Sequence, residues 1–312
     1  MIDYFVVVFR KELQMLRLLI RSLVKFTQPS TCRSLNIAIN EPHGEYQVTR
    51  LEIERIIAAE VKDESFRIMI VDFDPLLNKT TYAFKGWRSQ QAFKLLSHRF
   101  CTTDNIVVLD SKNFAIRQVS LADFVSKDDK PLVHLLTYKT DNKFHELAGY
   151  SRAFFGIYHD PTVDFKGFPS ITPAVLRRDA LNGLEKQIEK KTGLSLIDAF
   201  MTHEALEHTT EFLLYNAYIE SQDGVMAYYN EREPITQTFF GTSPKDDVGV
   251  ANVYKLLYRD SGVKFSGMHR RRLARLDGEE LSKFKELLRW SKLIESDQSF
   301  ISFIESSRED IG

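Results

Sequence analysis

The stretch that decides the fold lies near the start of the chain and reads Tyr4-Phe-Val-Val-Val-Phe9. It is continuously apolar and rich in β-branched and aromatic residues, which is typical of a strand covered on both faces. Leu13, Leu16 and Ile20 follow at steps of three and four residues, which predicts an amphipathic helix. A buried strand that leads directly into such a helix indicates the first half of a βαβ unit.

The alternation of strands and helices continues through the first third of the chain. Strand-like runs cover residues 35–39, 66–71 and 105–109, and a helical pattern at residues 92–96 precedes the last of them. Strands that alternate with helices in this way form parallel sheets with helices on both faces. The sequence therefore predicts a Rossmann-type α/β fold with a mainly parallel sheet.

Helices dominate the prediction for the rest of the chain. Thr172 and Pro173 indicate a helix start, as N-cap and first helical residue, and Gly193 indicates its end. Ser195 followed by Asp198 indicates the next start, as a shortened capping box. Further helical patterns cover residues 211–220, 281–288 and 300–304.

Composition and charge narrow the class of protein. Apolar residues make up 43% and charged residues 27% of the 312 residues, which excludes disordered and fibrous proteins. The formal net charge is −1, whereas a protein held to nucleic acid by its overall charge is basic, so we expect no nucleic-acid partner. The two cysteines fit a reducing compartment. No stretch reads as a signal peptide or a transmembrane segment, so we expect a cytoplasmic protein.

The expected ligand site follows from the expected sheet. Ligands of open parallel sheets bind beyond the carboxyl ends of the strands. Four loops lie there, at residues 10–12, 40–44, 72–74 and 110–113, and they combine carboxylates, cations and amides. Each of these charges could equally be an ordinary solvated one. Asp110 is the strongest candidate, because a carboxylate directly after four apolar residues needs a cation, a metal or hydrogen-bond donors; the alternative is that it only caps the next turn.

Four short motifs follow one another along the chain. They are Gly86-Trp87-Arg-Ser-Gln90-Gln91-Ala-Phe-Lys94-Leu95, Leu109-Asp110-Ser-Lys112-Asn113, Thr210-Glu211-Phe212-Leu-Leu-Tyr215 and Ser266-Gly-Met-His269-Arg270-Arg271. In this order they resemble a set of bacterial GT-A-type glycosyltransferase-like proteins, over most of the chain. The resemblance implies a GT-A-like fold and the transfer of a sugar from a nucleotide-diphosphate donor to a hydroxyl acceptor.

The resemblance also implies roles for individual residues. Glu211 would be the catalytic base that deprotonates the acceptor, unless it merely completes a helix N-terminus. Asp110 and Lys112 would act at the diphosphate. The expected substrate-binding residues are Arg10 and Glu41 at the nucleotide, and Gln90, Gln91, Asn113, His269 and Arg270 around the rest of the donor. The alternative for the basic run that contains His269 and Arg270 is that it forms only a solvated helix face.

A polar stretch at residues 126–131 indicates a division of the chain. On this interpretation, residues 1–125 form a nucleotide-binding, Rossmann-like half. Residues 126–275 form the helix-rich, acceptor-side half of the same catalytic domain. Residues 276–312 form C-terminal helices.

The chain departs from the metal-dependent pattern at Lys112, which stands where that pattern has a second carboxylate. Mg²⁺ and Mn²⁺ prefer oxygen ligands, and an ammonium two residues from Asp110 repels them. Either Lys112 takes over as a point charge at the diphosphate, or the donor is not a standard nucleotide sugar. The sequence therefore assigns no cofactor with certainty, and we favour a metal-independent reaction. The alternative is a Mg²⁺ or Mn²⁺ site at Asp72, Asp74 and Asp110.

The expected acceptor is a glycan or a lipid-linked molecule, in the synthesis of bacterial surface polysaccharide. Arg17, Arg21 and Lys25 form a cationic stripe that fits peripheral contact with the inner face of a membrane, although such a stripe is more typical of a solvated helix face. Two other functions stay open. A methyltransferase would need a glycine-rich turn after the first strand, which the chain lacks. A non-catalytic binding protein would explain the missing second carboxylate.

Overall fold

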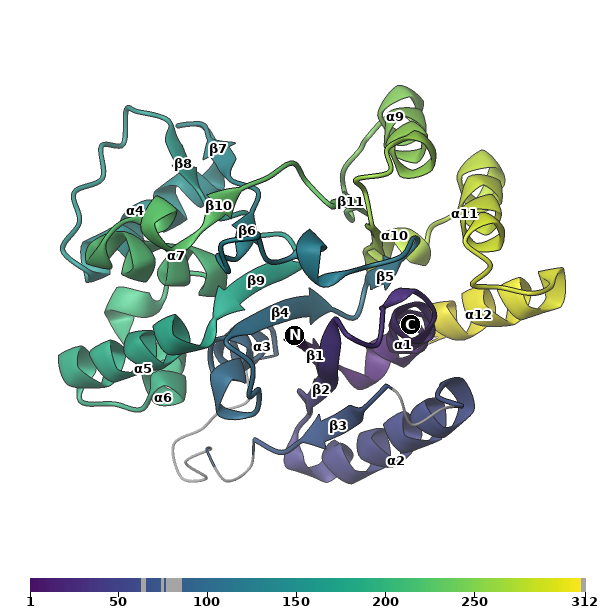
Figure 1. Ribbon diagram of the computed structural model, residues 1–312, viewed down its shortest axis with the longest axis horizontal. Helices are drawn as coiled ribbons and strands as arrows, with labels where there is room; N and C mark the ends of the chain where they lie inside the picture. Colours follow the sequence, from purple (N-terminus) through teal and green to yellow (C-terminus); the bar gives the residue numbers. More distant parts are fainter. Residues whose placement is uncertain (63–65, 74–75, 77–85, 310–312) are drawn as a thin grey trace.

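A sheet of five strands forms the centre of the protein (Figure 1). The computed structural model describes residues 1–62, 66–73, 76 and 86–309. The strands follow one another in space as β3 (Ile68–Val71), β2 (Cys32–Ile39), β1 (Ile2–Val8), β4 (Asn105–Asp110) and β9 (Ala174–Arg177). The first four run parallel, and β9 pairs antiparallel with β4 at the edge. The predicted mainly parallel α/β sheet is confirmed.

Helices cover both faces of this sheet. One face packs against α1 (Leu13–Phe26) and α2 (His43–Glu60); the other packs against α3 (Trp87–Leu95), α5 (Arg178–Thr192), α6 (Leu196–Thr202) and α7 (Glu211–Gln222). Along β1, Tyr4, Val6 and Val8 lie in the first core, and Phe5 and Val7 lie in the second. All five are fully buried, and each buried side chain of this size stabilises the fold by about 1.5–3 kcal/mol. This two-sided burial explains the unbroken apolar run in the sequence.

A second part of the molecule packs beside α1. It contains a three-stranded sheet in the order β11 (Thr236–Phe239), β12 (Phe265–Met268) and β5 (Asn113–Ala115). Its helices are α9 (Asp247–Arg259), α10 (Arg270–Leu273), α11 (Gly278–Trp290) and α12 (Asp297–Glu309), which share a core with Met15 and Leu18 of α1. The two C-terminal helices expected from the sequence are therefore confirmed.

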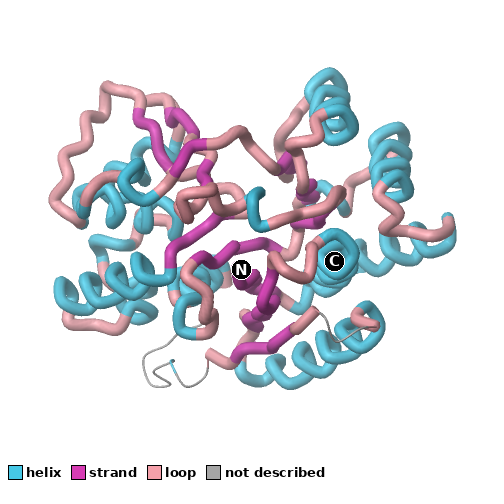
Figure 2. The backbone as a smooth tube through the Cα atoms, in the orientation of Figure 1, coloured by secondary structure: helices cyan, strands magenta, loops and turns pink. Residues whose placement is uncertain are grey.

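Shorter elements complete the chain on the side of β9. They are β6 (Leu132–Val133), β7 (Leu136–Tyr138), α4 (Lys143–Phe154), β8 (Phe165–Gly167), α8 (Val225–Tyr228) and β10 (Asn230–Glu231). Strand β6 pairs with β10, and β7 pairs with β8. Figure 2 shows the strands in the middle of the molecule with helices around them. The division of the chain at residues 125 and 275 stays a prediction.

The helix start predicted at Thr172 and Pro173 is wrong. Residues 174–177 form strand β9, and α5 begins only at Arg178. A proline is accepted both at the first position of a helix and just before an edge strand. Pro173 therefore does not distinguish a helix start from a strand start. The predicted end is confirmed, because Gly193 closes α5 with a φ of 70°. Ser195 also caps α6 as expected, since its side chain accepts a hydrogen bond from the backbone of Asp198.

The cationic stripe on α1 has partners within the protein. Arg17 and Arg21 each lie 2.7 Å from the carboxylate of Glu60 at the end of α2. Lys25 donates to the backbone oxygen of Lys292, in the segment before α12. The stripe thus joins α1 to α2 and to the C-terminal helices. Within the described ranges, no helix combines the length and apolar character that crossing a membrane requires.

Candidate functional site

A cavity of about 1060 Å³ opens at the carboxyl ends of β1, β2 and β4. Strand β1 lies between β2 and β4, so the order of the strands reverses at this point. Such a switch point is where open α/β sheets bind their ligands. The charged residues that line the cavity are Arg10, Lys11, Glu12, Glu41, Glu45, Lys94, Asp110, Lys112, Glu211, His269 and Arg270.

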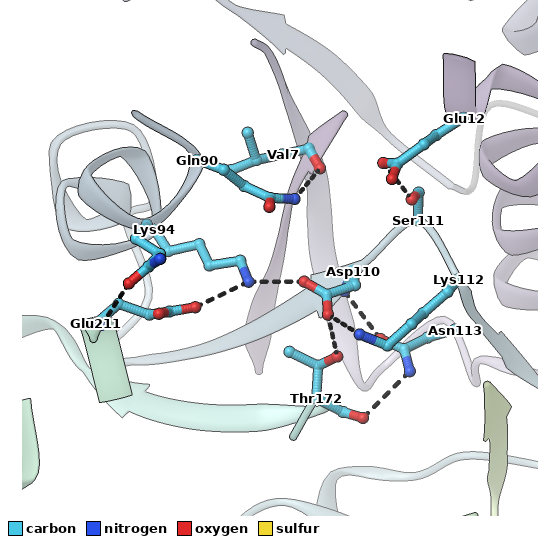
Figure 3. A network of polar contacts seen from close by, with 11 residues as sticks. Val7, Glu12, Gln90, Lys94, Asp110, Ser111, Lys112, Asn113, Thr172 and Glu211 are labelled. Atoms are coloured by element: carbon cyan, nitrogen blue, oxygen red, sulfur yellow. Dashed lines mark hydrogen bonds and ion pairs between the residues drawn. The ribbon is translucent and has the colours of Figure 1, made fainter. Parts of the chain in front are cut away.

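Asp110 lies between two lysines at the centre of this site (Figure 3). The Nζ atom of Lys94 lies 2.7 Å from one carboxylate oxygen, and Lys112 pairs with the other. Thr172 also donates a hydrogen bond to the second oxygen, at 3.0 Å. Lys94 in addition lies 3.0 Å from the carboxylate of Glu211. One buried ammonium therefore connects the end of β4 with the start of α7.

The charges in this cluster hold one another in their ionised forms. Burial raises the pKa of Asp110, but the ammonium groups of Lys112 and Lys94 outweigh burial and hold that pKa well below its usual range. Burial lowers the pKa of Lys94, whereas Asp110 and Glu211 raise it above its ordinary value. Asp110 and Lys94 are therefore charged at neutral pH. Removal of Lys94 would leave the buried carboxylate of Glu211 without its cation.

The sequence of α3 explains how Lys94 reaches this position. Arg88, Gln91 and Lys94 are spaced by three residues and lie on one face of the helix. Arg88 donates to the backbone oxygens of Leu206 and Thr209, while Gln91 accepts from the backbone N–H of Glu211. This face of α3 therefore holds the start of α7, and Lys94 adds an ion pair with Glu211 there.

Gln91 and Asn113 do not contact the cavity, which corrects their predicted role in substrate binding. Gln90 lines the cavity, but Gln91 is one residue further round the helix and is buried against α7. Asn113 is fully buried. It accepts a hydrogen bond from the backbone of Asp110 and donates one to the backbone oxygen of Thr172. Both side chains position other residues of the site.

Two glutamates near the ends of β1 and β2 have a raised pKa and are protonated more readily than usual. Burial raises the pKa of Glu12, and a hydrogen bond of 2.7 Å from Ser111 offsets part of this effect. Burial also raises the pKa of Glu41, whose carboxylate accepts a hydrogen bond from the backbone of Arg10. Glu12 differs from Asp110 in that no described cation forms an ion pair with it. Glu12 is therefore suited to accept a proton.

Cationic side chains also line the cavity. His269 begins α10, where its Nδ1 atom accepts a hydrogen bond from the backbone of Arg271. Burial and the nearby charges of Lys112 and Arg270 lower the pKa of His269, so the ring is neutral at neutral pH. Among the described residues, Arg270 and Lys11 have no ion-pair partner. These two cations are therefore available to an anionic ligand.

The arrangement around Asp110 does not suit a divalent cation. Both of its carboxylate oxygens are paired with ammonium groups, which compete with a metal and repel it. Asp72 follows β3 and is exposed, and it does not line the cavity; Asp74 lies outside the described residues. In the described part of the chain, no three His, Cys, Asp or Glu side chains come together in a metal-binding group. Of the two described members of the alternative metal set, only Asp110 therefore lines the cavity.

Several residues of the site were not singled out by the sequence. Lys94 was part of a motif but had no role, and Lys11 and Glu12 belonged to a loop of which only Arg10 was chosen. Trp87 lines the cavity with 61% of its surface exposed.

Comparisons with known proteins add a family and a structural neighbour. A family model described as "Family of unknown function (DUF6492)" matches residues 8–243. No curated protein matches the chain. Among solved structures, a crystal structure of the galactosyltransferase LgtC in complex with donor and acceptor sugar analogs is similar, with a TM-score of 0.47 and 9% sequence identity. The similarity covers 96% of this chain and 99% of that one.

Proposed function

The chain belongs to the DUF6492 family of unknown function, and from the chemistry of its cavity we propose that it is a metal-independent glycosyltransferase. The observation that carries the proposal is the Lys94–Asp110–Lys112 cluster at the switch point of the sheet. A diphosphate leaving group gains negative charge in the transition state and needs a cation beside it. Lys112 supplies that cation at the cavity wall, and Arg270 and Lys11 supply two more.

The proposed division of roles follows the walls of the cavity. The nucleotide lies along Arg10, Glu41 and the exposed ring of Trp87, at the ends of β1 and β2. The diphosphate lies against Lys112 and Arg270. Lys94 does not contact the donor, because its ammonium group is shared by two carboxylates and is buried.

We assign the proton transfer to Glu12 rather than to Glu211. Glu211 was the base expected from the sequence, and it does line the cavity. However, its carboxylate is already engaged by the buried ammonium of Lys94, which lies 3.0 Å away. Glu12 has a pKa raised by burial, and a raised pKa is what a general base needs at neutral pH. Glu211 then serves to hold Lys94.

The acceptor that we propose is a glycan or a lipid-linked hydroxyl compound, in the synthesis of bacterial surface polysaccharide. This part of the proposal is supported by the four sequence motifs, all of which contribute residues to the cavity wall: Trp87 and Gln90, Asp110 and Lys112, Glu211, and His269 and Arg270.

Calorimetry with a panel of nucleoside diphosphates and nucleotide sugars tests the proposal. We expect at least one nucleoside diphosphate to bind, equally well with Mn²⁺ and with EDTA. Lys112→Ala should weaken this binding by about tenfold or more, because a charge-assisted hydrogen bond is lost. Lys127→Ala, an exposed lysine in the 126–131 loop, is the matched control and should bind like the wild type.

Three results would contradict parts of the proposal. No binding at millimolar concentration contradicts a nucleotide-diphosphate donor. Strict dependence on Mn²⁺ contradicts metal independence. Binding without transfer or donor hydrolysis favours a non-catalytic binding protein, a function that is supported by the closed ion pair between Lys112 and Asp110.

A further inference from the structure

Two histidines join a surface loop to helix α4. The loop is made of residues 155–164 and leads from α4 to β8 at the edge of the molecule (Figure 1). His145 lies on α4 and is buried, and His159 lies in the loop. Their ring centres are 4.5 Å apart, and a hydrogen bond of 3.3 Å joins the two rings. A Cβ atom on Gly149 of α4 would lie 2.9 Å from the His159 ring, so this ring rests directly on the helix.

The bond between the rings is the middle one of a chain of three hydrogen bonds. At one end, Nη1 of Arg152 lies 2.9 Å from Nδ1 of His159. At the other end, Nε2 of His145 lies 2.7 Å from the backbone oxygen of Val163. A guanidinium group only donates and a carbonyl oxygen only accepts, so the two ends fix the direction of the chain. Each neutral ring then accepts at Nδ1 and donates from Nε2.

This chain has no place for a further proton. Since both Nε2 atoms already carry one, a second proton on either imidazole binds to Nδ1. On His159 it would point at the guanidinium of Arg152, and on His145 it would point at the N–H of His159. In either case two donors face each other, and a positive charge is added close to Arg152. The anchored loop therefore requires both rings to be neutral.

Two carboxylates and an aromatic ring also lie near His159. Glu220 of α7 is already engaged by Arg152, whose Nε atom lies 3.0 Å from it. Asp160 follows His159 in the loop, and Phe165 of β8 meets the His159 ring edge-on. The cation at Arg152 is therefore the charged group that directly contacts the imidazole.

The sign of the pH dependence follows from these surroundings. Burial lowers the pKa of His159, as do His145 and Arg152, and the carboxylates of Glu220 and Asp160 offset only part of this effect. An imidazole in a released loop titrates near pH 6.5. Below that pH the anchored loop binds fewer protons than the released one. Anchoring is therefore complete above about pH 6.5 and weakens as the pH falls.

We propose that His145 and His159 form a pH-sensitive catch, which holds loop 155–164 on α4 at neutral pH and releases it in mild acid. The catch adjoins the main cavity on both sides of the loop. Phe144, next to His145 on α4, lines that cavity, and so does Ser170, three residues after the end of β8. Release frees the segment that joins these two parts of the cavity wall.

Amide hydrogen exchange at pH 7.5 and pH 5.5, followed by mass spectrometry, tests the proposal on the protein without ligand. Exchange rates in residues 155–164 are divided by those of unstructured peptides at the same pH, which gives the opening equilibrium of the loop. We expect this equilibrium to rise by roughly five- to tenfold at pH 5.5, because an excluded proton contributes up to about tenfold per pH unit below 6.5. Peptides from β1 should show no such rise.

A double variant, His145→Gln and His159→Gln, removes both titratable rings. Its opening equilibrium should be the same at both pH values, whether or not the glutamines hold the loop as firmly as the histidines do. His208→Gln is the matched control. His208 also packs against α4, with its ring 5.0 Å from that of Tyr150, but it is exposed and lies outside the chain of hydrogen bonds. This control should keep the wild-type dependence on pH.

NMR of the histidine ring nitrogens gives a second readout on the wild-type protein. At pH 7.5 both rings should carry their proton on Nε2 and none on Nδ1. A proton on Nδ1 of either ring would overturn the proposal. So would equal opening of the wild-type loop at the two pH values, or a double variant that keeps the wild-type dependence. Because these measurements involve no nucleotide, their outcome is separate from that of the proposed function.

Discussion

Replacing Lys94 by methionine should destabilise the protein strongly, and more at neutral pH than in mild acid. Methionine keeps the length of the side chain but removes the ammonium that lies 2.7 Å from Asp110 and 3.0 Å from Glu211. Removal of one partner from a buried ion pair costs about 3–5 kcal/mol. Because this ammonium serves two carboxylates, we expect a loss of about 4 kcal/mol or more at pH 7.5.

The pH dependence follows from the carboxylates that the variant leaves behind. A buried carboxylate that has lost its cation takes up a proton at a higher pH than a carboxylate of the unfolded chain, whose pKa is about 4. In this variant that carboxylate is Glu211, because Asp110 keeps its ion pair with Lys112. The folded state then binds more protons than the unfolded state, so its stability falls as the pH rises above that value. The deficit against the wild type should therefore shrink at pH 5.5. The gain is about 1.4 kcal/mol for each pH unit over which the native carboxyl stays protonated.

Urea unfolding at pH 7.5 and pH 5.5, followed by circular dichroism, measures both effects. Lys112→Met is the matched control, because it removes the other cation at Asp110 and leaves Lys94 in place. Its loss should be no more than about 2 kcal/mol. If the Lys94 variant stays within about 1 kcal/mol of the wild type at both pH values, the buried ammonium is not what holds the two carboxylates, and the reasoning fails.

Three other changes test the site and the fold. Glu12→Gln should lower kcat and remove the acidic limb of the pH–rate profile, which in the wild type lies above the ordinary glutamate pKa because burial raises it; an unchanged profile rules out Glu12 as the base. Tryptophan fluorescence should be quenched by a bound nucleotide in the wild type and in Trp290→Phe, but not in Trp87→Phe. Quenching that survives in Trp87→Phe would show that the nucleobase does not lie against Trp87. Gly193→Ala should cost about 1 kcal/mol because of its positive φ, whereas Gly44→Ala, with open space around it, should not destabilise; equal unfolding midpoints would refute the strain argument.

The central strands of the sheet were predictable because burial on both faces requires an unbroken run of apolar residues. The run from Tyr4 to Val8 is apolar at every position since alternate residues enter different cores, and no tertiary information is needed to recognise this. Strand β9 was not predictable in the same way. It has four residues at the sheet edge and follows a proline, so the capping signal at Thr172 outweighed it.

The location of the site was predictable from the sequence, but the ion pairs within it were not. The rule for parallel sheets placed Asp110 and Lys112 at a cavity, and the structure brings both to its wall. The partners of Asp110 depend on tertiary contacts, however. Lys94 lies on a helix that the sequence shows only as amphipathic, and a lysine there is normally expected to reach into solvent. Only the packing of α3 against α7 shows that its charge is enclosed.

The two lysines at Asp110 have different surroundings. This difference supports the idea that Lys112 can exchange its ion pair with Asp110 for one with a diphosphate. Lys94 is 5% exposed and is held by two carboxylates, whereas Lys112 is 17% exposed and lies on the cavity wall. If Lys112 leaves Asp110 to meet a diphosphate, Lys94 and Thr172 still neutralise and hold the carboxylate. The buried ion pair therefore lowers the cost of releasing the exposed one, because no unpaired charge remains inside the protein. On the proposed function, Lys94 works at a distance from the substrate by making Lys112 available to it.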